Sequence, residues 1–573
     1  MQRCQPPGKK HWLAGIKQIF YVYTRITVIK TLIMSRRLLS TLEIVVIVLL
    51  ACVPLFATFP YRVNIFLSWE GAYRISEGQL PFRDFGTPLG GMYWVIPGIF
   101  FKIFGAQLIS LIKAQVFINI MSGLAFRSIL KSLSVQEGIR CISVVLFVLS
   151  YSFMNFWPWY NHTVIVYEFV ALAFLFKFMT AAVPSRKGFV WLVLSALFVL
   201  FSFFTKQDGG GMAFAICVAL LTYNSIRDKK WIGLIVFTGS FVVLMTVVVL
   251  WLNNYQYGYW FNHGQPPHSA RISLKEIFDD FFNSSQWLKF YLFLIAVLLF
   301  AYFKSWKSFY ADKKDGLFLL LTLAILGEAA VFQVTSYTPP DNNIFFHSFA
   351  FAYIISLLAR STSMNFAHRG TLFICFAGMA LWWSGTYWKY VQRITDRAFP
   401  EKESATTSPT GENVVNRKTY MIKKEDPRDI PMNQWVYTGL KTFDKIYMPK
   451  PTADGIHRLL AMPELKSGKD VKVLNMSELT PLAAEIPFQL ETGETYPLWF
   501  HLGVGMFNRE AQMFEERIAA GYYDIVLFEN IETLNNFYPF RIREALKKHY
   551  KLADVFLAPR RGDTVGEIEV YKK

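Results

Sequence analysis

The chain has 573 residues, 53% of them hydrophobic and 17% aromatic, with a formal net charge of +18 at pH 7. Soluble domains average about 45–50% apolar residues, and here the excess is gathered in long blocks, which excludes an ordinary soluble domain. From Lys389 onward 27 basic side chains face 26 acidic ones, against 32 and 15 before it. The excess of basic residues is not accompanied by a basic stripe or by a nucleic-acid-recognition motif, which argues against nucleic-acid binding. It indicates contact with anionic membrane lipids.

The apolar blocks predict a polytopic α-helical membrane protein with about eleven spans, because each approaches the roughly 20 residues that cross a hydrocarbon core. Residues 1–40 precede them as a basic segment without the features of a cleavable signal. The stretch 92–105 is too short and broken for a span, and we expect an interfacial helix there. The predicted spans are 41–59, 107–130, 140–157, 163–181, 188–204, 210–225, 231–252, 289–303, 317–336, 344–359 and 371–388.

Lys and Arg set the predicted orientation, since cytoplasmic loops are enriched in them. Residues 1–40 carry eight, and with alternate crossings the basic loops 227–230, 304–314 and 360–369 fall on the same side. That side is therefore predicted to be cytoplasmic, with the N-terminus. The opening loop and the C-terminus then lie outside, as expected for a multi-pass protein of a bacterial inner membrane.

The chain after the membrane domain 41–388 is predicted to form a second unit. Residues 389–432 are polar and read as a linker, and 433–573 alternate short apolar strands with amphipathic helices, which predicts an extracytoplasmic α/β domain. No Gly-rich phosphate loop follows a strand, so no cofactor is assigned, and an accessory or acceptor-docking role is expected. The predicted strands are 471–476, 523–529, 552–558 and 566–572, and the predicted helices are 509–521 and 540–550.

The first external loop, 60–106, holds an unusual density of charge. Its core "WEGAYRISEGQLPFRDFGTPLGG" (69–91) places Glu70, Arg74, Arg83 and Asp84 within fifteen residues. Outside the membrane a transferase lacks nucleotide sugars and needs a donor delivered in the bilayer, such as a polyprenyl-phosphate-linked sugar. Such a reaction needs a carboxylate to accept a proton from the acceptor and cations to hold the phosphate. The alternative is a surface loop whose charges pair with each other and with lipid head groups.

The order of residues in this loop resembles the first external loop of the GT-C superfamily of integral-membrane glycosyltransferases, which includes protein O-mannosyltransferases and lipid A aminoarabinose transferases. The matching residues are Trp69, Glu70, Tyr73, Gly78, Pro81, Phe82, Arg83, Asp84, Phe85, Pro88, Phe104 and Gly105. The resemblance covers the membrane half and says nothing specific about residues 430–573.

The resemblance implies Glu70 as the catalytic carboxylate. It departs from the family at Trp69, where a second acid is usual, so metal use is left without support and Asp84 is a second candidate acid of the loop. Asp84 would assist catalysis or cap the turn before "GTP". Arg83 and Arg74 are expected to bind the donor phosphate, and Tyr73 to face the acceptor.

A second stretch, "FFTKQDGGG" (203–211), lies between two predicted spans on the outer side. Lys206 and Gln207 beside exposed glycine N–H groups suit a phosphate clamp. A snorkelling Lys in a tight helical hairpin is the alternative.

Weaker candidates lie in other loops and in the spans. Acidic residues inside membrane spans are rare and are often functional. Two His residues without a third ligand at a recognised spacing favour a flexible lid rather than a metal site. These candidates are His263, His268 and Arg271 as a lid over the donor, His347 as a phosphate contact, and Glu168 and Glu328 within spans.

Together these features predict a membrane glycosyltransferase that moves a sugar from a polyprenyl-phosphate donor to a glycan, lipid or protein acceptor, with inversion. Two alternatives of other classes stay open. One is a transporter of lipid-linked glycans, and the other is a non-catalytic scaffold or sensor whose external domain binds a partner.

Overall fold

The structure is a computed structural model of the whole chain, and the description below is confined to part of it. The described residues are 34–573 with these gaps: 62–64, 151–156, 182–185, 253–272, 303–311, 336–344, most of 383–433, 467–470, 487–489, 494–495, 499–506, 532–538, 560–564 and residue 363.

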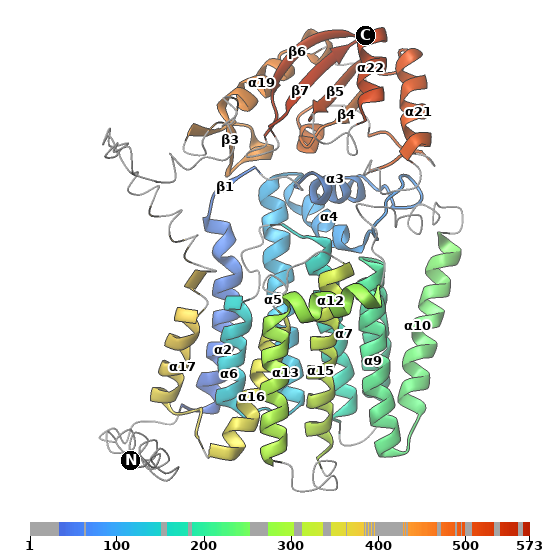
Figure 1. Cartoon of the computed structure of the whole chain (residues 1–573). Coiled ribbons are helices and arrows are strands. Elements are labelled where there is room, and N and C mark those ends of the chain that lie inside the picture. The colour runs from blue at the N-terminus through green and yellow to red at the C-terminus, as the bar shows by residue number, and fades with distance from the viewer. Residues whose placement is uncertain are drawn as a thin grey trace, which may run out of the picture.

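A bundle of long apolar helices forms the larger part of the molecule (Figure 1). Each of the eleven predicted spans contains a helix, which confirms the polytopic fold class. By length and composition, seven of the described helices suffice to cross a membrane, or up to eight if the bent pair α12–α13 is one span. The helices at the predicted spans are α2 Arg36–Cys52, α5 Leu108–Ser132, α6 Glu137–Ser150, α7 Tyr160–Met179, α8 Arg186–Phe203, α9 Gln207–Asp228, α10 Ile232–Trp251, α13 Gln286–Tyr302, α15 Lys313–Thr335, α16 Phe345–Thr362 and α17 Arg369–Trp382.

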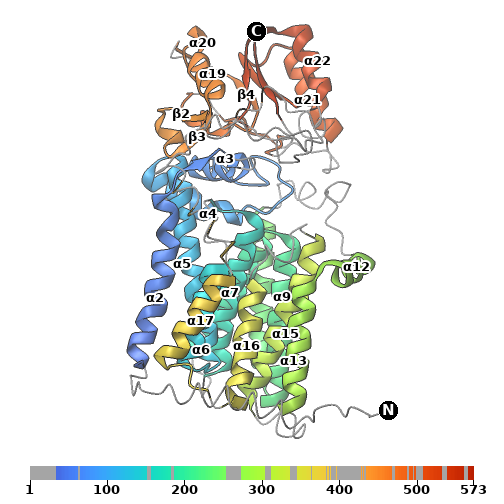
Figure 2. The ribbon, with the colours of Figure 1, turned by 60° about the vertical axis from the view of Figure 1, so that its left-hand side comes forward.

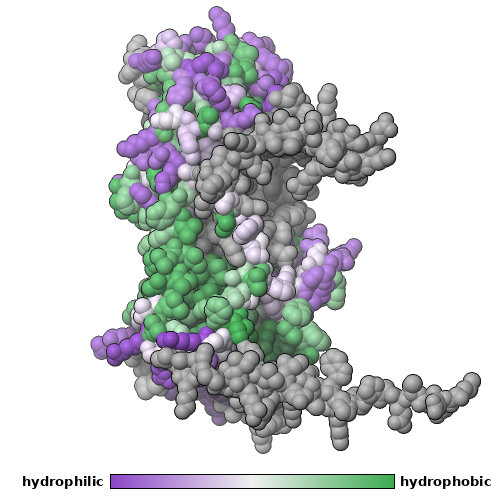
Figure 3. Space-filling model, turned by 90° about the vertical axis from the view of Figure 1, so that its left-hand side faces the viewer, coloured by the Kyte–Doolittle hydropathy of each residue, from purple (hydrophilic) through white to green (hydrophobic). Residues whose placement is uncertain are grey.

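Hydrophobic side chains cover the flank of this bundle, whereas hydrophilic ones gather on the C-terminal domain and at the opposite end of the molecule (Figure 3). At that opposite end the basic loops meet. Lys313 pairs with Asp228 at 2.5 Å, and Arg360 pairs with Asp315. The loops that alternation assigned to one side therefore do lie together, at the end where α2 begins (Figure 1).

The opening loop is more ordered than predicted. It contains helix α3 (Ile65–Ser76) and helix α4 (Met92–Phe104), and both lie across the other end of the bundle (Figure 2). The helix at 92–105 was predicted, but α3 was taken for loop, and that prediction was wrong. The apolar residues Ile65, Trp69 and Ala72 recur at helical spacing and are buried, and Gly78, with φ of 86°, follows the helix end in the left-handed conformation that favours glycine.

Helices α3 and α4 pack in close contact at a glycine. A Cβ atom on Gly71 would lie 2.1 Å from the ring of Trp94, so only glycine permits this approach. The Trp94 indole donates to the carbonyl of Leu67 at 2.9 Å, which fixes the two helices to each other. The pair lies between the bundle and the C-terminal domain (Figure 2).

The C-terminal domain is built on a four-stranded sheet of order β4-β5-β7-β6, with β4–β5 parallel and the other pairs antiparallel. All four predicted strands and both predicted helices are present, so the α/β prediction is confirmed. Helices α19 (Lys450–Leu460) and α20 (Pro463–Lys466) were not predicted. The strands are β4 Val473–Met476, β5 Ile525–Asn530, β6 Lys551–Leu557 and β7 Glu567–Lys572, and the predicted helices are α21 Phe507–Ala519 and α22 Phe540–His549.

A second sheet joins the two halves of the chain. Strand β1 (Phe59–Pro60), which follows the first span, pairs in parallel with β3 (Ile446–Pro449), and β3 pairs with β2 (Trp435–Tyr437). Buried hydrophobic side chains of α3 and of one face of the four-stranded sheet belong to one cluster. The C-terminal domain therefore packs directly on the opening loop, at the end of the bundle opposite the basic loops (Figure 2).

Candidate functional site

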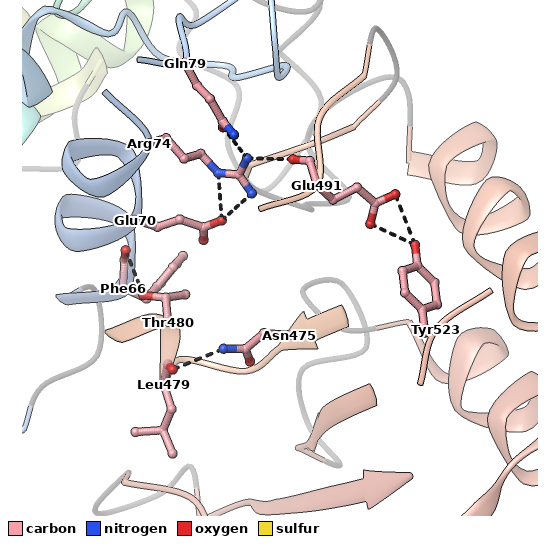
Figure 4. A network of polar contacts seen from close by, with 9 residues as sticks. All are labelled: Phe66, Glu70, Arg74, Gln79, Asn475, Leu479, Thr480, Glu491 and Tyr523. Atoms are coloured by element: carbon pink, nitrogen blue, oxygen red, sulfur yellow. Dashed lines mark hydrogen bonds and ion pairs between the residues drawn. The ribbon is translucent and has the colours of Figure 1, made fainter. Parts of the chain in front are cut away.

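Glu70 and Arg74 lie one turn apart on α3, and their side chains form an ion pair. The Glu70 Oε1 atom accepts hydrogen bonds from Arg74 Nε at 3.1 Å and from Nη2 at 3.0 Å (Figure 4). Residues four apart on a helix face the same side. Trp69, which stands where the resemblance has a second acid, points the other way into the core and packs on Tyr73 and Phe101.

The Arg74 guanidinium is enclosed by both halves of the chain. Its side chain is only 1% exposed, and Nη1 donates to Gln79 Oε1 at 2.8 Å and to the carbonyl of Glu491 at 2.7 Å. The rings of Phe85 and Tyr496 lie 5.3 and 5.0 Å from its central carbon, within the range of a cation–π contact. Arg74 is therefore committed to the protein itself, and the prediction that it binds donor phosphate gains nothing from this placement.

A pocket opens between α3 and the C-terminal domain, with about 340 Å³ of empty space that includes open solvent. Glu70 and Arg74 form the wall from the membrane half. The remaining wall comes from the C-terminal domain and is made by Val473, Asn475, Thr480, Ala483, Leu490, Glu491 and Tyr496. The pocket therefore exists because two distant parts of the sequence meet over a helix that carries a carboxylate.

The electrostatics of Glu70 suit a proton acceptor. Burial raises the pKa of its carboxyl above the ordinary value, and the neighbouring Arg74 charge opposes that rise. Only Oε1 takes up the hydrogen bonds of Arg74; no bond to Oε2 is formed by any residue that the structure describes. A largely buried carboxylate with a free oxygen, beside a cation that favours its ionised form, is the arrangement expected of a general base.

Arg83 and Asp84 form an ion pair with each other, and neither is among the residues that line the pocket. Their side chains meet at 2.6 Å, and Asp84 also accepts from the backbone N–H of Leu80 at 2.7 Å. Arg83 donates to the carbonyl of Gly78 and is 40% exposed. Neither side chain lines the pocket, so Asp84 here closes the turn, which is the structural role that the sequence left open.

Lys206 lies at a different place, at the start of α9. Its ammonium pairs with Asp208 at 3.0 Å and lies 4.9 Å from the ring centre of Phe332 and 5.9 Å from that of Tyr160. Burial lowers its pKa, and the Asp208 carboxylate counteracts this. Gln207 is the first residue of α9.

Aromatic side chains separate the two charged places. The rings form a continuous series of contacts from Arg74 to Lys206, which runs through Phe85, Trp94, Tyr93 and Tyr160 with successive centroid distances of 6.1, 4.6 and 5.9 Å. The structure thus brings Glu70 and Arg74 into one pocket and leaves Arg83, Asp84 and Lys206 outside it.

The other predicted residues lie farther from this chemistry or outside the described residues. Tyr73 packs beside the pocket, and its hydroxyl lies 3.5 Å from the carbonyl of Ala483. His347 is buried in the bundle, where Nδ1 lies 2.8 Å from the hydroxyl of Tyr291. The proposed lid residues His263, His268 and Arg271 fall in 253–272, outside the described part of the chain.

Two further observations bear on the chemistry of the membrane half. Glu168 of α7 and Glu328 of α15 are buried in the bundle and their carboxyl groups face each other. Among the described residues there is no group of three or more His, Cys, Asp or Glu side chains that could hold a metal ion.

Sequence reasoning missed the contribution of the C-terminal domain to the pocket. Glu491 and Tyr496 lie in a polar stretch, "LETGETYPL" (490–498), that carries no recognisable pattern. Only the fold reveals them, because the backbone of this stretch pairs with the opening loop: Gly86 N–H donates to the Tyr496 carbonyl at 2.8 Å.

Comparison with known proteins gives little at the level of sequence. No family model matches the chain, and no curated protein matches it significantly. Among solved structures, the crystal structure of ArnT from Cupriavidus metallidurans bound to undecaprenyl phosphate is similar over 93% of this chain and 97% of that one, with 11% sequence identity and a TM-score of 0.46. An identity of this size does not transfer a residue's role from one protein to another.

Proposed function

We propose that this protein is a membrane glycosyltransferase that uses a polyprenyl-phosphate-linked sugar, with Glu70 as its general base. The single observation that supports this most strongly is the position of Glu70. It is the one acid of the opening loop that lines the pocket, and it is held by a buried Arg at the end of a many-span bundle. The motif of the opening loop, with its resemblance to GT-C glycosyltransferases, supports the same reading.

In the proposed reaction an acceptor hydroxyl enters the pocket and attacks the anomeric carbon of the donor sugar. The new bond joins the acceptor oxygen to that carbon, while the bond from the carbon to the phosphate oxygen breaks. Glu70 Oε2 takes the hydroxyl proton, the lipid phosphate leaves with the bonding electron pair, and the configuration inverts. Arg74 keeps Glu70 ionised before the reaction, since an opposite charge within about 4–6 Å favours the charged form.

The leaving phosphate needs cations, for which Arg83 and Lys206 are the proposed sources. Each is engaged by a carboxylate, Asp84 and Asp208 respectively. On binding, the donor phosphate would exchange with that carboxylate. The Lys206 site lies beyond the aromatic series from Glu70, so its use requires Tyr93 and Tyr160 to move when the donor enters.

The proposed location is a bacterial inner membrane, with the N-terminus in the cytoplasm and the C-terminal domain outside. The gathering of basic loops at one end of the bundle supports this orientation. An external site agrees with a donor carried by a membrane lipid, and the acceptor, whether glycan, lipid or protein, would reach the pocket from the side of the C-terminal domain.

One observation favours a second function. Glu168 and Glu328 face each other inside the bundle, and buried acids in membrane spans often line transport pathways. A transporter of lipid-linked glycans is therefore the runner-up.

The test is the turnover of Glu70→Gln with a panel of radiolabelled polyprenyl-phosphate sugars and membrane glycan acceptors. Loss of a general base typically costs about 10²–10⁴ in rate, so transfer should nearly disappear while donor binding persists. Glu77→Gln is the matched control, because Glu77 follows the same helix but is exposed. Wild-type transfer together with full activity of Glu70→Gln would exclude Glu70 as the base.

A further inference from the structure

Arg74 is held by the C-terminal domain as much as by its own helix. We propose that Glu491 and Tyr496 are positioning residues, which fix Arg74 against Glu70 so that the pocket is competent only while the C-terminal domain is docked. This inference rests on the proposed function, because it gives Glu70 the role of base. It assigns the C-terminal domain a part in the catalytic site in place of the accessory role that the sequence predicts.

The first support for this inference is the set of hydrogen bonds that Arg74 makes. A guanidinium has five N–H donors in a planar fork. Nε and Nη2 are used by Glu70, and Nη1 is shared between Gln79 and the Glu491 carbonyl. Without the Glu491 carbonyl and the Tyr496 ring, only α3, Gln79 and Phe85 would hold the guanidinium, and it would be free to turn from Glu70 toward solvent.

The C-terminal contacts are themselves anchored. The Glu491 carboxylate accepts from the Tyr523 hydroxyl at 3.0 Å (Figure 4). It also pairs with Arg517. Tyr523 is only 1% exposed, so this anchor belongs to the core of the C-terminal domain. Glu491 thus links that core to Arg74 through one residue.

Backbone pairing fixes Tyr496 over the guanidinium. Gly86 of the opening loop donates to the Tyr496 carbonyl at 2.8 Å and accepts from the Leu498 N–H at 2.9 Å. Gly493 donates to the carbonyl of Asp84 at 2.9 Å. The opening loop and the C-terminal domain therefore share a short ladder directly beside the ion pair, and undocking would remove both contacts from Arg74 together.

The physical consequence is a change in the charge of Glu70. In the docked form the Arg74 charge offsets the burial of the carboxyl group. When Arg74 is held less tightly, the charged form of Glu70 loses this support, and its titration moves to higher pH. The base would then be protonated over more of the pH range in which the enzyme works.

The experiment uses the full-length protein in membranes and follows the Glu70 carboxyl band by infrared titration, assigned through its absence in Glu70→Gln. Tyr496→Leu should raise the midpoint by about 0.5–1 pH unit, a part of the 1–3 units that an adjacent opposite charge supplies. Tyr496→Phe keeps the ring over Arg74 and loses only the hydroxyl, which also interacts with Arg74, so its midpoint should rise by less than that of Tyr496→Leu. Tyr437→Leu is the matched control, since Tyr437 lies 53% exposed on β2 of the same domain.

Tyr523→Phe is a second variant that should fold normally, because it deletes one hydroxyl and retains the buried ring. It loosens Glu491 and should shift the midpoint in the same direction by less. Absence of a shift in both Tyr496→Leu and Tyr523→Phe, or an equal shift in Tyr437→Leu, would overturn the inference. The readout needs no sugar transfer, so failure of the proposed function would appear separately, as an inactive wild type.

Discussion

Replacing Arg74 with Met tests whether the ion pair with Glu70 stabilises the fold as well as the site. The change removes two hydrogen bonds to Glu70, leaves the Gln79 side chain and the Glu491 carbonyl without this donor, and keeps most of the side-chain volume. The side chains of Arg74 and Glu70 are 1% and 14% exposed, so little solvent screens the charge that remains. Breaking a buried pair on one side costs about 3–5 kcal/mol, and we expect a destabilisation of that size at neutral pH.

The deficit should depend on pH in a defined direction. In an unfolded chain Glu70 titrates near about 4.3, whereas burial raises its pKa in the folded protein, and loss of Arg74 raises it further. A carboxyl whose folded pKa is raised binds protons more tightly in the folded state, so its ionisation destabilises the fold as pH rises between the two values. The Arg74→Met deficit should therefore be largest at neutral pH and shrink on acidification. Adding Glu70→Gln should remove this pH dependence.

Thermal unfolding in detergent across pH 4–8 or so measures these effects for the single and double variants. Arg458→Met is the matched control, because Arg458 forms a comparable pair with Asp554 but is 51% exposed, and exposed pairs contribute about 0–1 kcal/mol. A deficit in Arg74→Met as small as in Arg458→Met would refute the reasoning. So would a deficit that does not change with pH, because it would show that the ionised Glu70 does not need Arg74.

Three further predictions concern the surroundings of the site. Gly71→Ala should destabilise the protein by about 1–3 kcal/mol, as overpacking does, because its Cβ would overlap the Trp94 ring; an unchanged melting temperature in detergent would contradict the close contact of α3 and α4. Arg83→Ala should weaken the binding of a radiolabelled polyprenyl-phosphate sugar in a filter assay while stability stays within about 0.5 kcal/mol, as for most surface changes; unchanged binding would remove Arg83 from the phosphate site. Lys206→Met should also reduce donor binding, and restored binding in Lys206→Arg would show that the charge is what matters.

The sequence predicted the parts of this protein that local pattern determines. Apolar length alone locates the eleven helices at predicted spans, and alternation of Lys and Arg groups the basic loops at one end. The strands of the C-terminal sheet follow from short apolar runs between polar turns. Helix α3 was not predicted because the charged residues Glu70 and Arg74 interrupt its apolar pattern and suggested a loop. Their i, i+4 spacing is nevertheless that of a helix. Glu70 itself was predicted from the motif, and the structure adds the pocket around it.

The rest of the site could not be predicted because it depends on contacts across more than four hundred residues. The Glu491 carbonyl is a backbone group, which any residue type supplies, so no sequence pattern marks it. Tyr496 is one of 28 tyrosines, and its place over Arg74 is set by ladder bonds to Gly86. The assignment of Arg83, Asp84 and Lys206 to one site assumed that nearness along the chain or a shared side of the membrane means nearness in space. The aromatic series between Arg74 and Lys206 is a tertiary feature that separates them.

The burial of Arg74 explains why the two halves of the chain must be joined. A guanidinium removed from water is strongly unfavourable unless its donors are satisfied, and α3 alone supplies only the Glu70 carboxylate. Gln79 adds one acceptor from the loop, and the fourth bond and the second ring face come from the C-terminal domain. Helix α3 is therefore stable with Arg74 inside only when that domain covers it. The strand pairing of β1 with β3 and the shared hydrophobic cluster keep it there, so the contacts that complete the fold are the same contacts that form the pocket around Glu70.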